Sequence, residues 1–295
     1  MPGLAVPMRS VRSPIVRLMW RHILSAVMVI LLLPGMVHGT TVNEHMELET
    51  RVCGIKEPFV FWLWSLAAGS ADASRLAGLV GVDDLSFTTQ DNRELRGYRL
   101  GSRATYPRGY LLVLQGNAIL ADQLLGEFVA YADAGYDVYM YDYRGYGRSQ
   151  GKRRLKAIVS DVQEIIAALN TKAYARHLVY AFSFGGIVLL DGYDGEQELH
   201  RVVIDSSPSR LSEYGCPVEF DPIEHLPEHC ANFMFISGQG DTVVTPAMST
   251  DLLTQAEHCE ARVESEFDFA HPFMDPDPAR HQQRMKMIEQ FLLFQ

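Results

Sequence analysis

The chain of 295 residues lacks an excess of positive charge, since 26 lysines and arginines stand against 36 aspartates and glutamates. The formal net charge of −10 argues against a long-range attraction to nucleic acid or to anionic lipid. The sequence also has no internal repeat, no linker rich in proline and serine, and no low-complexity segment. With 47% apolar residues it is too apolar for a disordered chain, and its length fits one large domain.

An apolar run of the length that spans a membrane is not found near the N-terminus. The run 23–37 has 15 residues and carries Pro34 near its end. Four arginines and no acidic residue accompany it within residues 1–39, and small residues stand at −3 and −1 before Thr40. This pattern predicts a signal peptide over 1–39 and an exported protein, periplasmic or secreted. The alternative is an uncleaved N-terminal anchor. No cysteine lies near the predicted cut, so a lipoprotein is not supported.

Cysteine is scarce, and all four cysteines follow the predicted cut. An even number in an exported protein predicts disulfides. The pair Cys216–Cys230 is favoured because it closes one short loop, and Cys53–Cys259 follows by elimination. Four buried free thiols are the alternative.

Residues 40–83 form a lead-in segment with an apolar aromatic cluster at 59–64. We expect this cluster to pack against the main core, as such segments usually do. The alternative is a lipid-facing patch in peripheral contact with a membrane, because tryptophan favours membrane interfaces.

From Asp84 onward, apolar runs of strand length alternate with segments of helical spacing. This alternation predicts one α/β domain over 84–295, with a mostly parallel eight-stranded sheet, helices on both faces and an antiparallel hairpin at its start. The expected strands span 85–88, 95–100, 110–114, 137–141, 177–181, 201–204, 232–237 and 261–267, and the expected helices span 119–134, 155–169, 247–256 and 278–294, with a further apolar helix after Gly186.

A serine stands where one strand turns sharply into a helix, in the run Ala181–Gly186. Ser183 has a small residue two positions before it and Gly185 two positions after it, as a strained turn that exposes a nucleophilic hydroxyl requires. This context predicts a nucleophile. The alternative is a serine that caps the helix.

A serine nucleophile needs a base and an acid that orients the base. Asp241 follows the strand expected at 232–237, and His271 follows the last expected strand. Both loops would lie at the carboxyl edge of the sheet, where ligands bind in open α/β sheets. The order serine, aspartate, histidine predicts a catalytic triad of Ser183, Asp241 and His271.

An oxyanion hole would complete this site. The N–H of Phe184, directly after the nucleophile, is one expected donor, and the loop Gln115–Ala118 after an early strand supplies the other. Gly116 allows a close approach, which leaves Asn117 or Ala118 to donate. A plain strand-to-helix turn is the alternative for this loop.

Together these motifs resemble those of the α/β-hydrolase superfamily over 84–295, and most closely those of the Bem46-like, abhydrolase-domain serine hydrolases. Two positions depart from that family, which usually has histidine where Gln115 stands and glycine where Ala181 stands. The resemblance implies an α/β-hydrolase fold with a structural turn in its arginine-rich motif. The matching segments are 87–91, 115–118, 141–149, 181–186 and the loops of Asp241 and His271.

The predicted function is hydrolysis of carboxylic ester or thioester bonds through an acyl-enzyme, without a cofactor, on a small-molecule or lipid-like substrate. The interval 205–231 leaves room only for a very small cap, so we expect an open site. A metal site at His225, His229 and Cys230 is rejected because Pro227 interrupts the helix that would align them. A catalytically silent binding protein and a serine peptidase are the alternatives. The residues expected to contact substrate are Gln115, Phe182 and Phe273, with Phe184 as further apolar lining.

Overall fold

The structure of the protein is a computed structural model that describes residues 48–195 and 197–294. These residues all belong to the compact unit Gly35–Gln295. The predicted signal peptide, 1–39, lies outside the described residues. Within the described part of the chain, no helix has the length and apolar character needed to cross a membrane.

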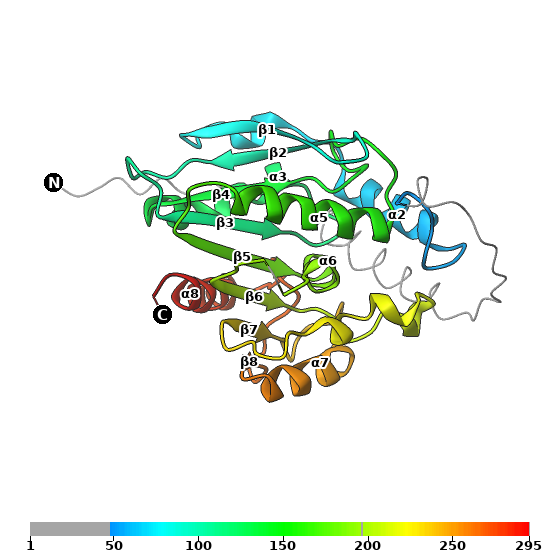
Figure 1. Ribbon diagram of the computed structural model, residues 1–295. Helices are drawn as coiled ribbons and strands as arrows, with labels where there is room; N and C mark the ends of the chain where they lie inside the picture. The colour runs from blue at the N-terminus through cyan, green and yellow to red at the C-terminus, as the bar shows by residue number, and fades with distance from the viewer. Residues whose placement is uncertain (1–47, 196, 295) are drawn as a thin grey trace. The chain divides into compact units, whose positions relative to one another are not determined.

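An eight-stranded sheet forms the centre of this unit (Figure 1). The strands lie side by side in the order β1-β2-β4-β3-β5-β6-β7-β8, and those from β3 to β8 pair in parallel. β2 is antiparallel to both of its neighbours, so the predicted hairpin and the mostly parallel sheet are confirmed. The strands are β1 Val82–Thr88, β2 Glu94–Leu100, β3 Gly109–Leu114, β4 Tyr136–Tyr141, β5 Arg176–Phe182, β6 Arg201–Asp205, β7 Phe233–Ile236 and β8 Arg262–Glu264.

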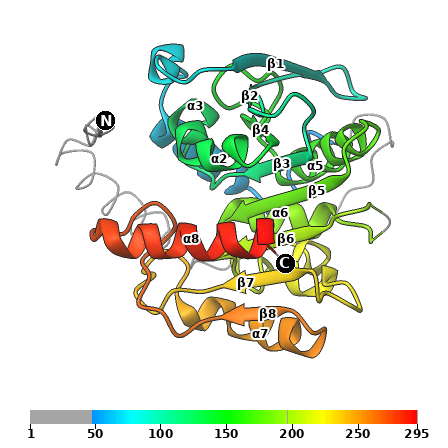
Figure 2. The same cartoon turned by 90° about the vertical axis from the view of Figure 1, so that its left-hand side faces the viewer.

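Helices cover both faces of the sheet because the central strands are apolar on both sides. In β5, Val179 and Ala181 pack toward α5 and α6, whereas Tyr180 and Phe182 pack toward α4 and α8. Figure 2 shows α8 lying along its face of the sheet. The helices are α2 Glu57–Ala68, α3 Ala121–Leu124, α4 Val129–Asp133, α5 Leu155–Asn170, α6 Phe184–Gly192, α7 Pro246–His258 and α8 Pro278–Phe294, and two 3-10 helices are η2 Ala73–Leu76 and η3 Leu125–Phe128.

The single helix predicted over 119–134 is wrong in its continuity. The segment is divided into α3, η3 and α4. Gly126 lies in the middle piece, and glycine is a poor helix former, so the segment folds as three short turns. Leu124, Leu125 and Phe128 are still buried, as the apolar spacing indicated.

The aromatic cluster 59–64 lies on α2, at the carboxyl edge of the parallel strands (Figure 1). Core packing is confirmed for Val60 and Phe61, each 5% exposed. Trp62, in contrast, is 46% exposed. The short interval between β6 and β7 forms a small cap of three 3-10 helices, η4 Ser212–Tyr214, η5 Val218–Phe220 and η6 Pro222–His225.

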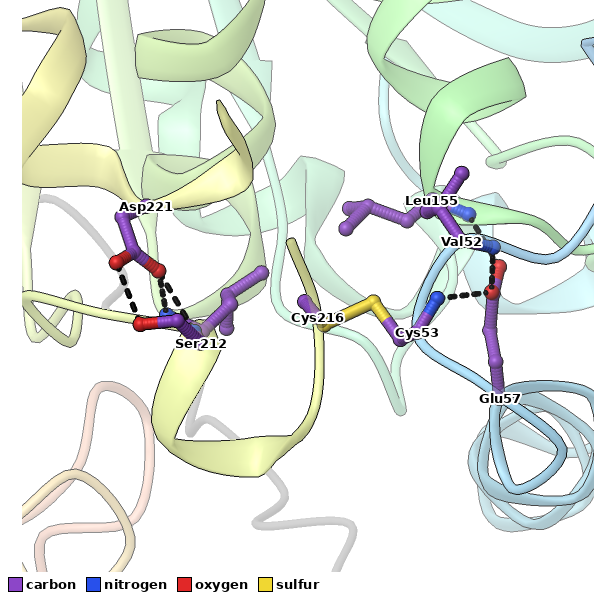
Figure 3. The surroundings of a disulfide bond; sticks show 8 residues. Val52, Cys53, Glu57, Leu155, Ser212, Cys216 and Asp221 are labelled. Carbon is purple, nitrogen blue, oxygen red and sulfur yellow. Dashed lines mark hydrogen bonds between the residues drawn. A yellow bond between two sulfur atoms is a disulfide. The ribbon is translucent and has the colours of Figure 1, made fainter. Parts of the chain in front are cut away.

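All four cysteines form disulfides, but the predicted pairing is wrong. One bond joins Cys53 to Cys216 (Figure 3), and the other joins Cys230 to Cys259. Loop length governs closure in the unfolded chain, whereas the fold decides which cysteines meet. Cys230 precedes β7 and Cys259 ends α7, and the N–H of Cys230 donates to the carbonyl of Cys259 at 2.8 Å. The cap is therefore tied to the start of α2 rather than to itself.

Removal of the Cys53–Cys216 bond is expected to destabilise the protein more than removal of the other bond. The sequence separations are 163 and 29 residues. The chain-entropy model gives about 5 kcal/mol for the longer loop and roughly 3.5 kcal/mol for the shorter one. Urea unfolding of the two double serine variants, Cys53→Ser/Cys216→Ser and Cys230→Ser/Cys259→Ser, measures the difference. Equal losses, or a larger loss for the second variant, would contradict the prediction.

Candidate active site

Ser183 lies at a strained turn between β5 and α6. Its backbone has φ 54° and ψ −121°, a conformation that costs free energy for a residue other than glycine and occurs most often at functional sites. The N–H of Ser183 donates to the carbonyl of Asp205 at 2.8 Å, which fixes the turn on β6. Ser183 is 7% exposed. The structure therefore confirms that this serine lies at a turn between a strand and a helix.

The neighbouring strand explains the glycine two positions after the serine. A Cβ atom on Gly185 would lie 1.9 Å from the carbonyl oxygen of Leu114, at the end of β3. No side chain fits there, so α6 approaches the sheet only with glycine at this position. Ala181, which replaces the expected glycine, is fully buried inside β5 and does not disturb the turn.

The loop after β3 lies against this turn. A Cβ atom built on Gly116 would be 3.6 Å from the Cβ of Ser183 and 3.2 Å from the ring of Phe182. Asn117 follows in the same loop and is half-buried. Phe184 is the first residue of α6, and the first N–H groups of a helix have no acceptor within it. The structure thus places both predicted donor segments beside the serine.

Asp241 and His271 are brought together from loops 30 residues apart. The Nδ1 atom of His271 lies 2.8 Å from Oδ2 of Asp241. The other carboxylate oxygen, Oδ1, accepts the N–H groups of Val243 at 2.8 Å and Val244 at 2.9 Å. Both side chains are buried, with Asp241 3% and His271 9% exposed. The carboxylate is therefore held rigidly and directs one ring nitrogen of the histidine.

The surroundings of Asp241 favour its ionised form. Burial acts to raise the pKa of this carboxyl, but the charge and hydrogen bond of His271 and the N–H groups of Val243 and Val244 outweigh it. The pKa of Asp241 consequently lies below its usual range. An ionised carboxylate at this place stabilises a positively charged histidine.

The loops that carry the acid and the histidine touch through their backbones. A Cβ atom on Gly238, three residues before Asp241, would lie 2.1 Å from the carbonyl oxygen of Phe269. Glycine is required at this contact, and it allows the loop after β7 to approach the loop after β8. This contact between Gly238 and Phe269 therefore holds the loop of Asp241 beside the loop of His271.

The three residues expected to contact substrate lie close to the turn. Phe182 and Phe273 have ring centroids 5.0 Å apart, and Phe273 adopts a left-handed φ of 62°. Gln115 is fully buried, and its Nε2 atom donates to the carbonyl of Tyr141 at 2.7 Å. Its contact with substrate stays a prediction, as does that of both phenylalanines.

No group of three or more histidine, cysteine, aspartate or glutamate side chains suited to a metal ion is found in residues 48–195 and 197–294. Cys230, one member of the set considered from the sequence, is bonded to Cys259.

The sequence did not reveal a buried cluster of charges behind the histidine loop. Arg284 of α8 is 1% exposed, and its Nε lies 3.6 Å from Oδ2 of Asp205. Its Nη1 lies 3.9 Å from Oδ2 of Asp275, and its guanidinium lies over the ring of Phe269 at 4.7 Å. No guanidinium nitrogen has a hydrogen-bond partner among the described residues. Asp275 Oδ1 accepts the N–H of Ala270, so the cluster supports the loop of the catalytic candidate.

Asp205 ends β6, at the same sheet edge as the serine. Burial raises the pKa of Asp205, against the opposing effects of Arg284, Tyr180 and His271. The sequence contained one signal for Asp205, namely a polar residue at the carboxyl end of an apolar strand. Arg284 gave none, because a single arginine on a helix usually faces solvent.

Replacing Arg284 with methionine is expected to destabilise the protein by about 3–5 kcal/mol, because two buried carboxylates lose their cation. Urea unfolding measures this loss. The matched control is Arg280→Met on the same helix, whose side chain is 44% exposed and pairs with Asp268. An exposed pair contributes about 1 kcal/mol or less. Equal losses in the two variants would show that the cluster does not support the fold.

Comparison with known proteins agrees with this fold. Residues 106–215 match the family described as serine aminopeptidase, S33. The structure is similar to the esterase Pf2001 of Pyrococcus furiosus, with a TM-score of 0.60 and 18% identity over 76% of this chain and 96% of that one. It is also similar to XC6422 of Xanthomonas campestris, an α/β serine hydrolase without lid, with a TM-score of 0.58 and 15% identity over 72% and 94% of the two chains. The chain has the α/β-hydrolase fold.

One curated relative of this α/β-hydrolase fold protein is the uncharacterized protein YfhR of Escherichia coli, 26% identical over 137 residues. The match covers 43% of this chain and spans about half, 47%, of the relative. The superfamily resemblance drawn from the sequence is confirmed, whereas the Bem46-like grouping within it stays a prediction. In this α/β-hydrolase fold, the loops after β5, β7 and β8 carry Ser183, Asp241 and His271.

Proposed function

We propose that the protein is a serine hydrolase that cleaves carboxylic ester or thioester bonds through an acyl-enzyme on Ser183. The observation that carries the proposal is the 2.8 Å contact between His271 Nδ1 and the buried carboxylate of Asp241, at the sheet edge where Ser183 has a strained backbone. A carboxylate that holds one ring nitrogen leaves the other, Nε2, to act as a base.

In the proposed mechanism, His271 Nε2 takes the proton of the Ser183 hydroxyl as its oxygen attacks the substrate carbonyl. Asp241 keeps the proton on Nδ1 and stabilises the charged ring. The N–H groups of Phe184 and Asn117 bind the oxyanion. His271 then donates its proton to the leaving group, and water attacks the acyl-enzyme with the same base. The reaction uses no cofactor.

The substrate class follows from the small cap and the aromatic side chains near the turn. Phe182 and Phe273 contact each other beside the loop of Gly116, and Phe184 packs toward α2. These rings favour an apolar acyl group, and the short cap favours an open site. We therefore propose a small-molecule or lipid-like ester as substrate.

A serine peptidase is the second candidate, because the matched family is described as a serine aminopeptidase. A catalytically silent binding protein is the third. A panel of p-nitrophenyl esters, acyl thioesters and aminoacyl p-nitroanilides, together with a fluorophosphonate probe located by mass spectrometry, separates the three. Ester or thioester turnover with label on Ser183 supports the proposal. Anilide turnover alone supports the peptidase, and a folded protein without label supports the silent protein.

We also propose that the protein is exported. Two disulfides in the described residues fit an oxidising compartment, and the arginine-rich start followed by the apolar run 23–37 supports a signal peptide over 1–39. Residues 40–83 then precede the hydrolase domain, 84–295. Fractionation of expressing cells and the N-terminal mass of the product test this proposal, because an uncleaved anchor leaves the full-length chain in the membrane fraction.

A further inference from the structure

The outer face of α2 carries a row of exposed apolar side chains. Ile55 is 78%, Phe59 46%, Trp62 46% and Leu66 64% exposed. Spacings of three and four residues place Phe59, Trp62 and Leu66 on one side of α2, and Ile55 lies in the turn before the helix. Phe59 and Trp62 stack with ring centroids 5.8 Å apart. We call these four residues the α2 apolar stripe.

A disulfide joins the cap loop that precedes Val218 to the turn before α2. Cys53 stands two residues before Ile55, and Cys216 stands two residues before Val218, which is 57% exposed. Figure 3 shows how this bond joins the start of α2 to the cap loop. Of the eight large hydrophobic side chains that are exposed in the described residues, five belong to the stripe or to Val218. Such a concentration marks a contact surface rather than scattered exposure.

The inner face of the same helix lies against the candidate active site. Phe61 and Trp64 contact the ring of Phe184 with centroids 5.5 and 6.1 Å apart. Phe184 directly follows Ser183. A partner bound to the stripe is therefore separated from the candidate nucleophile by the thickness of one helix.

The segment 50–69, which contains α2, has more basic than acidic residues, unlike the whole chain. Within 50–69 the only carboxylate is that of Glu57, which is 3% exposed, and this segment also contains Arg51 and Lys56. Arg153 donates to the hydroxyl of Ser65 on α2 at 2.7 Å. Lys152, the preceding residue, is 67% exposed, and its Nζ lies 3.9 Å from Oε2 of Glu49. A protein of net charge −10 thus presents bases beside the exposed apolar side chains of α2, whereas the exposed carboxylate of Glu219 lies next to Val218 in the cap.

We propose that the α2 apolar stripe docks on the surface of a lipid bilayer that contains anionic lipids. Tryptophan and phenylalanine are suited to the boundary between headgroups and acyl chains, and the flanking lysine and arginine side chains to the anionic headgroups. The stripe lies on one convex helix, so a flat bilayer covers it without a groove. Docking does not depend on the proposed chemistry, and it presents the candidate active site to lipid-like molecules.

The test uses the protein as isolated from expressing cells, with its N-terminus read by mass spectrometry, in the Ser183→Ala background so that no chemistry occurs. Sedimentation with phosphatidylcholine vesicles, with and without phosphatidylglycerol, measures partitioning. We expect binding to vesicles with phosphatidylglycerol that weakens with salt. Phe59→Ser/Trp62→Ser/Leu66→Ser should lower the partition coefficient about tenfold or more. The matched control is Val80→Ser/Tyr106→Ser, which removes exposed apolar side chains elsewhere, 72% and 86% exposed, and should change nothing.

Quenching by brominated lipid reports on α2 whether or not residues 23–37 remain attached. The difference in fluorescence between the protein and its Trp62→Phe variant gives the contribution of Trp62 to the total fluorescence. We expect brominated lipid in vesicles to quench this contribution. An unquenched Trp62, or equal partitioning of the triple variant and the control, would overturn the proposal. A third outcome would also overturn it: the protein binds no vesicles, and sedimentation velocity shows a concentration-dependent dimer that is lost in the triple variant. The stripe would then join two copies of the chain.

Discussion

The Ser183→Ala variant is expected to lose essentially all ester turnover, with kcat about a million-fold lower, while its unfolding in urea stays close to that of the unchanged protein. In the proposed mechanism the acyl-enzyme forms on this hydroxyl. Without it, the N–H groups of the oxyanion hole remain, but no oxyanion forms for them to bind. Replacing serine by alanine at φ 54° keeps the same backbone cost, so little stability change is expected.

The measurement is single-turnover kinetics together with fluorophosphonate labelling. The matched control is Ser207→Ala, a buried serine that touches α6 near Gly186 and whose hydroxyl has no hydrogen-bond partner among the described residues. This control should keep full labelling and turnover. Label retained by Ser183→Ala at another residue would place the nucleophile elsewhere and remove the basis of the proposal.

The Asp241→Asn variant is expected to reduce kcat about ten-thousand-fold at neutral pH. An asparagine amide that donates to Nδ1 holds the ring in the wrong tautomer, with the proton on the nitrogen that must accept one. Asn also keeps an oxygen for the N–H groups of Val243 and Val244, so the loop keeps its support. The kcat of the variant on an ester substrate, compared with its urea unfolding, separates catalysis from folding.

The matched control is Asp221→Asn in the cap. Asp221 is also a buried carboxylate that accepts the N–H groups of Leu211 and Ser212 and the hydroxyl of Ser212 (Figure 3). Unlike Asp241, it pairs with no histidine among residues 48–195 and 197–294. It should lose stability and keep kcat within a few-fold. A similar loss of kcat in both variants would indicate that Asp241 acts only through the fold.

The lowered pKa of Asp241 also predicts how the free energy of unfolding changes with pH. Its pKa is lower in the folded protein than the ordinary value of 3.8, so ionisation stabilises the fold above pH 3.8. That contribution is lost as the pH falls from 3.8 through the lower folded pKa. Asp241→Asn removes this contribution, so the variant should lose less stability than the unchanged protein over the same acid range.

The residues of the candidate site were found from the sequence because each follows a strand with a clear apolar pattern. Ser183, Asp241 and His271 stand one to several residues after β5, β7 and β8, and a parallel sheet brings such loops to one edge. The spacing of apolar residues along the chain located each loop, and the expected parallel topology implied that the three loops meet at one edge of the sheet. Their roles in catalysis stay predictions.

Features that depend on packing between distant segments were not found in this way. The disulfide of Cys53 with Cys216 joins residues that no local pattern relates, and the short-loop argument selected the wrong partner. Arg284 meets Asp205 only because α8 crosses the far face of β6. The sequence also did not predict which side of α2 is buried and which is exposed. Apolar residues lie on all sides of this helix, so they give no amphipathic pattern.

Glu57 has a consequence for where an autonomous folding unit begins. Its buried carboxylate accepts the N–H of Val52 at 2.6 Å and of Cys53 at 2.8 Å, and also that of Leu155, the first residue of α5, at 3.0 Å (Figure 3). A chain shortened to start at Asp84 would leave α5 without this acceptor and would uncover the ring of Phe184. We therefore expect that the sheet does not fold as a separate module, and that a circular permutant or a domain graft has to carry the segment from Val52 with it.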